Sequence, residues 1–183
     1  LSNYGENQVP NICENELSVY AFGKGDSEGE RKKDQAKKEA LLRKLTKQVK
    51  SKESVFDFNN LIPSPDWDST PNEDGELPSE VEEIRNKSNG LLVMSLKKFP
   101  VSGRTDERWF DWNRENWGTK WNAGKAEVYV CKYGDHVQFK FQTAWCAPVE
   151  ILLALRDQYP QLQFNWFYRI EEWEDCGFLH REV

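Results

Sequence analysis

The feature that most constrains the fold is a tryptophan-rich stretch, residues 109–121, which reads WFDWNRENWGTKW. It holds four of the chain's 8 tryptophans, interleaved with acidic, basic and amide side chains. An indole ring is costly to leave in water, and its N–H usually finds a partner when the ring is buried. The stretch therefore predicts either an irregular plug of the core or one wall of a binding cleft.

A second segment, Thr143–Trp145, ends an irregular turn beside a predicted strand, as the end of the tryptophan-rich stretch does. If the two segments converge, they form a cleft whose tryptophan rings offer flat walls to a base, a sugar or a peptide aromatic. The candidate residues of that cleft are Asn116, Trp117, Thr119, Lys120, Trp121, Thr143 and Trp145. Alternatively, these tryptophans pack over the sheet, and Asn116 and Thr119 bond the turn backbone. Both interpretations remain open at this point.

Hydrophobic periodicity predicts a mixture of strands and helices. Alternating residues predict strands at 17–22, 55–59, 126–133, 136–143, 164–170 and 176–180. Helical spacing and capping signals predict helices at 30–50, at 79–88 behind a Ser-x-x-Glu capping box, from about 105 to Gly118, and from Pro148 to Pro160. Gly134–Asp135 predicts a two-residue hairpin turn.

This order of elements predicts an α+β fold. A strand–helix–strand unit comes first, and a hairpin, a helix and further strands follow, which suits helices packed on one face of an antiparallel sheet. A ferredoxin-like, split βαβ sheet satisfies the order. We expect a single domain over residues 1–183, with an inserted loop and helix region at 66–108, which begins in an acidic, proline-rich segment.

Charge is distributed unevenly along the chain. The whole chain carries −6, whereas residues 31–52 contain ten Lys or Arg against Asp34 and Glu39. A basic helix of this kind can meet phosphates, and Lys37, Lys38, Lys44 and Lys47 are its candidate nucleic-acid contacts. The alternative is an ordinary solvated helix face, and the acidic remainder would repel a polyanion.

No motif in the sequence predicts catalysis, a metal or a cofactor. Glu115 could serve as a general acid or base beside Asp111 if tryptophans desolvate it, but a salt link at the helix end is the simpler interpretation. His136 and His180 each fall on a predicted strand, and a metal site would need both to meet Cys or Asp, which their spacing does not indicate. Cys146 precedes a helix and could have a lowered pKa, although a buried, inert thiol is the usual outcome.

Cysteine spacing and hydropathy indicate the compartment. None of Cys13, Cys131, Cys146 and Cys176 lies in a C-x-x-C pair, a pattern that fits reduced thiols in a cytoplasmic protein. No apolar run is long enough to span a membrane, and no signal peptide is visible. We therefore expect a cytoplasmic protein without membrane contact.

Four segments together resemble the YubB-type ferredoxin-like domain family of phages, plasmids and bacterial genomes. They are VPNICEN (9–15), FDFNNLIPSP (56–65), ENWGTKWNA (115–123) and FQTAWCAP (141–148). The resemblance implies the fold named above and brings no catalytic residues. The name "ferredoxin-like" describes topology only, and we expect no iron–sulfur cluster because the sequence lacks clustered cysteine ligands.

These observations favour a non-enzymatic binding or accessory module of a mobile genetic element, with a protein as its partner. The alternative is a protein that binds single-stranded nucleic acid through the basic helix at 31–52 and exposed aromatic rings.

Overall fold

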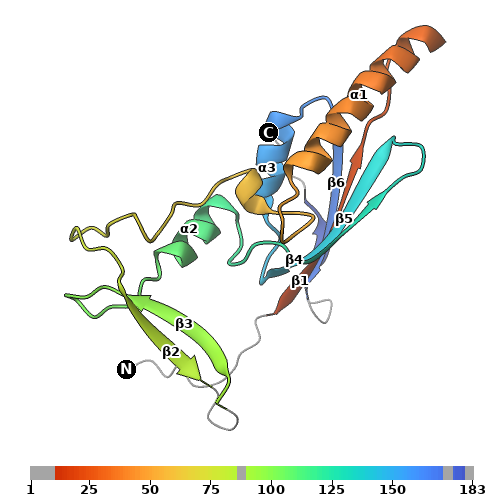
Figure 1. The fold of residues 1–183 in the computed structure, drawn as a ribbon. Coiled ribbons are helices and arrows are strands. Elements are labelled where there is room, and N and C mark those ends of the chain that lie inside the picture. Colours follow the sequence, from red (N-terminus) through yellow and green to blue (C-terminus); the bar gives the residue numbers. More distant parts are fainter. Residues whose placement is uncertain (1–10, 86–89, 171–174, 180–183) are drawn as a thin grey trace. The chain divides into compact units, whose positions relative to one another are not determined.

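The computed structural model describes residues 11–85, 90–170 and 175–179 (Figure 1). The chain divides into two compact units. Unit 1 comprises Leu1–Pro63 and Arg114–Val183, and unit 2 comprises Ser64–Asn113. The grouping of 1–183 into one domain with an insertion at 66–108 stays a prediction.

Unit 1 is built on a five-stranded antiparallel sheet in the order β4-β5-β1-β6-β7. The strands are β1 (Ile12–Tyr20), β4 (Gly124–Val130), β5 (His136–Ala144), β6 (Gln163–Ile170) and β7 (Cys176–Phe178). Helix α1 (Glu28–Gln48) follows β1, and α3 (Val149–Gln158) links β5 to β6. Because β1 lies between β5 and β6, α3 crosses from one neighbour of β1 to the other. This arrangement is the ferredoxin-like α+β fold, and the predicted fold class is confirmed.

Helices α1 and α3 lie on one face of this sheet (Figure 1), and that face carries the core. Alternate residues of β1, β5 and β6, such as Leu17, Phe139 and Trp166, are almost fully buried. They are covered by apolar side chains of α1 and α3, including Leu45 and Ile151. The intervening residues of β5 are less buried, so the predicted wet face of this strand is confirmed.

Helix α1 begins two residues earlier than predicted because a capping box fixes its start. The Ser27 hydroxyl accepts from the Glu30 backbone N–H at 3.2 Å, and the Glu30 carboxylate accepts from the Ser27 N–H at 3.1 Å. These bonds satisfy donors that a helix N-terminus otherwise leaves unpaired, so the helix runs from Glu28.

The strand predicted at 55–59 is wrong. The segment is a loop that leads into a short 3₁₀ helix, η1 (Phe58–Asn60), which the Asp57 carboxylate caps by accepting from the Asn59 N–H. Phe56 and Phe58 are nonetheless fully buried. The alternation therefore identified two core residues correctly, but their burial comes from insertion against Phe139 and Phe141 rather than from strand pairing.

The predicted turn at Gly134–Asp135 is also longer than expected. The Cys131 N–H donates to the His136 carbonyl at 3.1 Å, and the Gly134 N–H donates to the Cys131 carbonyl at 2.9 Å. The hairpin is therefore closed by the residues 132–135, with Gly134 at a φ of 74°.

Unit 2 contains an antiparallel hairpin of β2 (Glu80–Arg85) and β3 (Leu92–Lys98). The helix predicted at 79–88 is thus wrong over 80–85, and 86–89 lie outside the described residues. The capping signal at Ser79 is local, and it loses to the ladder that β3 offers, in which Glu80 pairs with Lys98. The Ser79 N–H itself donates to the Lys98 carbonyl.

Arg108, at the start of helix α2 (Arg108–Asn116), organises unit 2. Its guanidinium donates to both Asp106 carboxylate oxygens at 2.7 and 2.8 Å, and to the carbonyls of Thr70 and Trp67. It also lies 5.1 Å from the ring centroids of Trp67 and Phe99. Hydrogen bonds from Arg108 hold the pKa of the nearly buried Asp106 carboxyl below its ordinary value.

No helix in the described ranges has both the length and the apolar composition needed to cross a membrane.

Candidate functional site

The candidate site is a tryptophan cluster formed by Lys120, Trp121 and Trp145. The Lys120 ammonium lies 5.0 Å from the Trp145 ring centroid and 5.6 Å from that of Trp121. Both tryptophans are 41% exposed. The structure therefore brings the two sequence segments together and leaves two indoles, with a cation between them, partly open to solvent.

Trp145 occupies a strained turn. Its φ is 70°, and the Cys146 N–H donates back to the Ala144 carbonyl at 2.9 Å, which makes Trp145 the central residue of a γ-turn. A positive φ is unfavourable for a bulky L-residue. In the described part of the chain, the only other non-glycine residue with positive φ is Lys125, at 49°.

A buried polar network holds this strained turn in place. The Thr119 hydroxyl donates to the Ala144 carbonyl at 2.8 Å, and the Thr143 hydroxyl donates to the Cys146 carbonyl at 2.8 Å. Asn15 donates to the Thr143 oxygen at 2.9 Å, and the Trp145 N–H donates to the Asn11 carbonyl at 2.9 Å. The carbonyls of Ala144 and Cys146, on either side of Trp145, are thus both held by hydrogen bonds from buried hydroxyls.

Several residues predicted to line the cleft lie in the interior beneath the tryptophan cluster instead. Trp117 is 4% exposed, its indole N–H donates to the Ile62 carbonyl at 2.9 Å, and its ring packs edge-on against Phe58. Thr119 and Thr143 are almost completely buried, and Asn116 is half-buried. Trp117, Thr119 and Thr143 therefore pack in the core or bond the backbone, as the alternative interpretation expected. The partly exposed surface of the cluster is formed by Lys120, Trp121 and Trp145.

Sequence reasoning missed the role of Asn122 and Asp57. The Asn122 amide donates to the Asp57 carboxylate at 2.7 Å, and its oxygen accepts from the Phe58 N–H at 2.9 Å. Burial raises the pKa of Asp57, but the hydrogen bonds from Asn122, Ser51 and Asn59 outweigh it and lower the pKa overall. Both residues lie in the segments that carry the family resemblance, which is the signal that could have identified them.

The groups considered for catalysis are not arranged for it. Glu115 and Asp111 are both exposed, so the desolvation that would activate Glu115 is absent. Cys146 is exposed, so the buried thiol expected for this residue is wrong. Partial burial of its Sγ, which lies 2.9 Å from the Gly118 carbonyl that accepts from it, shifts the pKa of the thiol upward rather than downward. His136 is half-buried, and His180 lies outside the described residues.

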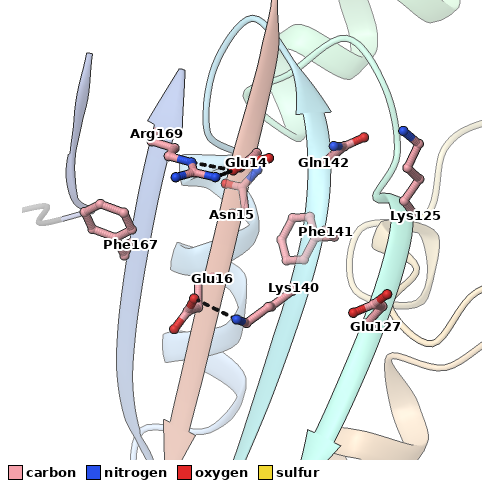
Figure 2. A pocket seen from close by; sticks show the side chains of 10 residues that line it. All are labelled: Glu14, Asn15, Glu16, Lys125, Glu127, Lys140, Phe141, Gln142, Phe167 and Arg169. Atoms are coloured by element: carbon pink, nitrogen blue, oxygen red, sulfur yellow. Dashed lines mark hydrogen bonds and ion pairs between the residues drawn. The ribbon is translucent and has the colours of Figure 1, made fainter. Parts of the chain in front are cut away.

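The solvent-facing side of the sheet carries a hollow of about 490 Å³ (Figure 2). Its charged lining residues are Glu14, Glu16, Glu127, Lys125, Lys140 and Arg169. Figure 2 shows that Glu14 pairs with Arg169 and Glu16 with Lys140 across neighbouring strands. Three acids and three bases balance, so this face offers no net attraction to a polyanion.

The hollow and the tryptophan cluster belong to the same end of the sheet. Gly124, at the start of β4, pairs with Gln142 near the end of β5, and the register shifts between Gly124 and Glu127. Lys125 lies within this bulge with its positive φ and lines the hollow. Bulges commonly re-aim a side chain next to a functional site.

Comparison with known proteins gives one finding. Searches of curated proteins and of solved structures return no match. Residues 116–180, which contain the tryptophan cluster, β4, β5, α3, β6 and β7, match the family model described as the ferredoxin-like domain in Api92-like protein.

Proposed function

We propose that the chain is a non-enzymatic binding module and that the tryptophan cluster contacts a protein partner. The observation that carries this proposal is the strained, partly exposed Trp145 stacked with Lys120. Backbone strain of this kind costs about 1–3 kcal/mol and persists where the surrounding structure over-determines it, often at binding sites. Tryptophan is also among the residues that contribute most to protein–protein affinity.

The chemistry of the cluster suggests what the partner presents. Two indole faces favour apolar or aromatic side chains, and the Lys120 ammonium favours a carboxylate. A cation–π contact strengthens when a partner removes it from water. The matching surface is therefore an apolar side chain next to an Asp or Glu.

The network beneath the cluster makes it a rigid contact surface. Thr119, Thr143 and Asn15 fix the γ-turn before any partner arrives. A surface that is already ordered loses less conformational entropy on binding. This rigidity distinguishes the cluster from scattered exposed aromatics, which need no functional explanation.

An accessory role in a phage or plasmid is part of the same proposal. The four segments that resemble the YubB-type family support it. The four cysteines are free thiols, which supports a cytoplasmic location, because disulfides are rare in that compartment.

Affinity capture from a host lysate tests the proposal. Immobilised wild-type chain is compared with Trp121→Ala and Trp145→Ala, and with Tyr133→Ala as the matched control, since Tyr133 is 72% exposed on the β4–β5 loop. We expect a captured protein that both tryptophan changes remove and Tyr133→Ala retains, at low and at high salt. Equal capture by all four proteins contradicts the assignment of the surface.

A specific observation supports single-stranded nucleic acid as a second candidate. Lys33, Lys37, Lys44 and Lys47 follow one another at helical spacing along α1 and are all exposed. Among the described residues, no ion pair involves these four, whereas Lys38 is buried, pairs with Asp34 and donates to the Phe22 carbonyl. Lys38 therefore leaves the proposed basic stripe, which spans roughly 20 Å of helix at 1.5 Å per residue.

Anisotropy of a labelled oligothymidylate tests this alternative. Lys37→Glu/Lys44→Glu is compared with the charge-matched Lys125→Glu/Lys132→Glu, which changes exposed lysines outside α1. If the basic stripe binds the oligothymidylate, the affinity falls steeply as salt is added. Only the Lys37→Glu/Lys44→Glu variant then loses binding. Equal loss in both variants, or no binding at low salt, eliminates the stripe.

A further inference from the structure

We propose that the loop between β4 and β5 binds a zinc ion through Cys131, Asp135 and His136. Sequence spacing does not indicate this site, because the two histidines do not form a metal-binding pattern. The folded hairpin nevertheless brings one thiol, one carboxylate and one imidazole together, with their ligand atoms all within 4.8 Å of one another.

The backbone fixes all three residues. Cys131 and His136 face each other across the hairpin, where the Cys131 N–H donates to the His136 carbonyl at 3.1 Å. The Asp135 carbonyl accepts from the Ala21 N–H at 2.8 Å, which attaches the loop to the chain just after β1. The positive φ of Gly134 allows the tight return between them.

Neighbouring side chains orient the imidazole. The His136 Nδ1 lies 3.1 Å from an Asp135 carboxylate oxygen. The rings of Tyr20 and Tyr129 lie 5.5 and 6.4 Å from the imidazole centroid. The His136 and Asp135 side chains keep 32% and 33% exposure, so an ion can reach the site from solvent.

The donor set selects the metal. Thiolate and imidazole favour zinc over magnesium or calcium, which prefer oxygen ligands. Tetrahedral zinc with bonds of about 2.0–2.3 Å separates its ligand atoms by roughly 3.3–3.8 Å. The His136 Nδ1 and the Asp135 carboxylate oxygen, at 3.1 Å, are already close to this separation, and the ligand atoms all lie within 4.8 Å of one another.

Three protein ligands leave one coordination position for water or for a group from a partner. Cys131 binds as the thiolate, so its proton is released to solvent when the ion enters. Bound zinc then cross-links the two ends of the β4–β5 loop.

Titration of the reduced chain with Zn²⁺ and Co²⁺ tests the proposal. We expect one equivalent of Zn²⁺ to bind and Co²⁺ to give a thiolate charge-transfer absorption band. Cys131→Ser removes that band, and both Cys131→Ser and His136→Gln weaken Zn²⁺ binding by about tenfold or more. Cys176→Ser is the matched control, because Cys176 is an exposed, free thiol on β7, and its variant retains wild-type binding.

A measurement on the unaltered chain guards against variants that fail to fold. Zn²⁺ protects Cys131 from alkylation, as mapped by mass spectrometry, while Cys176 in the same sample stays reactive. Absence of stoichiometric Zn²⁺ binding, equal protection of both thiols, or full binding by Cys131→Ser overturns the proposal.

Discussion

Replacing Trp145 by glycine and by alanine separates backbone strain from the loss of the ring. Both changes remove the indole and its interaction with Lys120, so the two variants differ only in how they tolerate the backbone conformation. Only glycine accepts the φ of 70° without a steric penalty. Backbone strain of this kind costs other residues about 1–3 kcal/mol, against an entropic penalty for glycine of about 0.5–1 kcal/mol. We expect Trp145→Gly to be more stable than Trp145→Ala by about 0.5–2 kcal/mol.

Trp121 provides the control, because it is equally exposed and its φ is not positive. There, alanine is expected to be more stable than glycine by about 0.5–1 kcal/mol. Urea unfolding followed by far-UV circular dichroism measures all four free energies with the same probe. If alanine is the more stable residue at both positions, the γ-turn is not strained as described.

Three further predictions concern the charged and buried groups. Arg108→Ala leaves the nearly buried Asp106 carboxylate without its partner and destabilises unit 2 by about 3 kcal/mol, measured by hydrogen exchange of the β2–β3 amides. In the wild type, Arg108 lowers the pKa of Asp106, so the ion pair stabilises unit 2 fully above the unfolded pKa of about 3.9. This stabilisation is lost as the pH falls through the lower pKa of Asp106 in the folded chain. Arg108→Ala should not show that pH-dependent loss of stability. Asn122→Asp places a second carboxylate beside Asp57 and is expected to destabilise unit 1 by about 2 kcal/mol at pH 7. Because two like charges raise the pKa values of both carboxyls in the folded chain, stability should recover as the pH falls. Urea unfolding at about pH 7 and about pH 4.5 checks the direction of this pH dependence. Burial raises the pKa of Cys13 to about 11, so iodoacetamide at about pH 8 should leave Cys13 unmodified in the native chain, and its modification without unfolding would contradict the packing.

Strong periodicity made most of unit 1 predictable. The alternation in β5 and β6 and the helical spacing of α1 and α3 reflect one-sided burial, which period-2 and period-3.6 patterns record directly. The wrong predictions fall where contacts with distant parts of the chain determine the local structure. The Phe56–Phe58 alternation records burial without strand pairing, and the Ser79 capping signal yields to the ladder with β3.

The sequence predicts where the candidate site lies, but it does not predict which of its tryptophans are buried and which are exposed. The sequence places Trp117, Trp121 and Trp145 in two segments that meet, yet nothing in their spacing says which ring is covered. Burial of Trp117 follows from its contact with Phe58 and Ile62, more than fifty residues earlier in the chain. The positive φ of Trp145 is equally invisible, because glycine is the usual sequence signal for such a conformation.

The proposed metal ligands are hidden by the length of one turn rather than by long-range packing, because the predicted two-residue turn at Gly134–Asp135 would set Tyr133, not Cys131, opposite His136. Cys131 and His136 are brought face to face by strand register, and Asp135 is held by Ala21. The sequence signal for a hairpin is present, but it does not show the turn length that places Cys131 opposite His136.

Binding of a protein partner by the tryptophan cluster is tested most directly by quantitative mass spectrometry of captured proteins. The baits are wild type, Trp121→Ala, Trp145→Ala and Tyr133→Ala. We expect at least one protein that is enriched on wild type and Tyr133→Ala, absent from both tryptophan variants and retained at high salt. Identical captured proteins on all four baits, or material that is nucleic acid and is released by salt, would contradict a protein-binding role for the cluster.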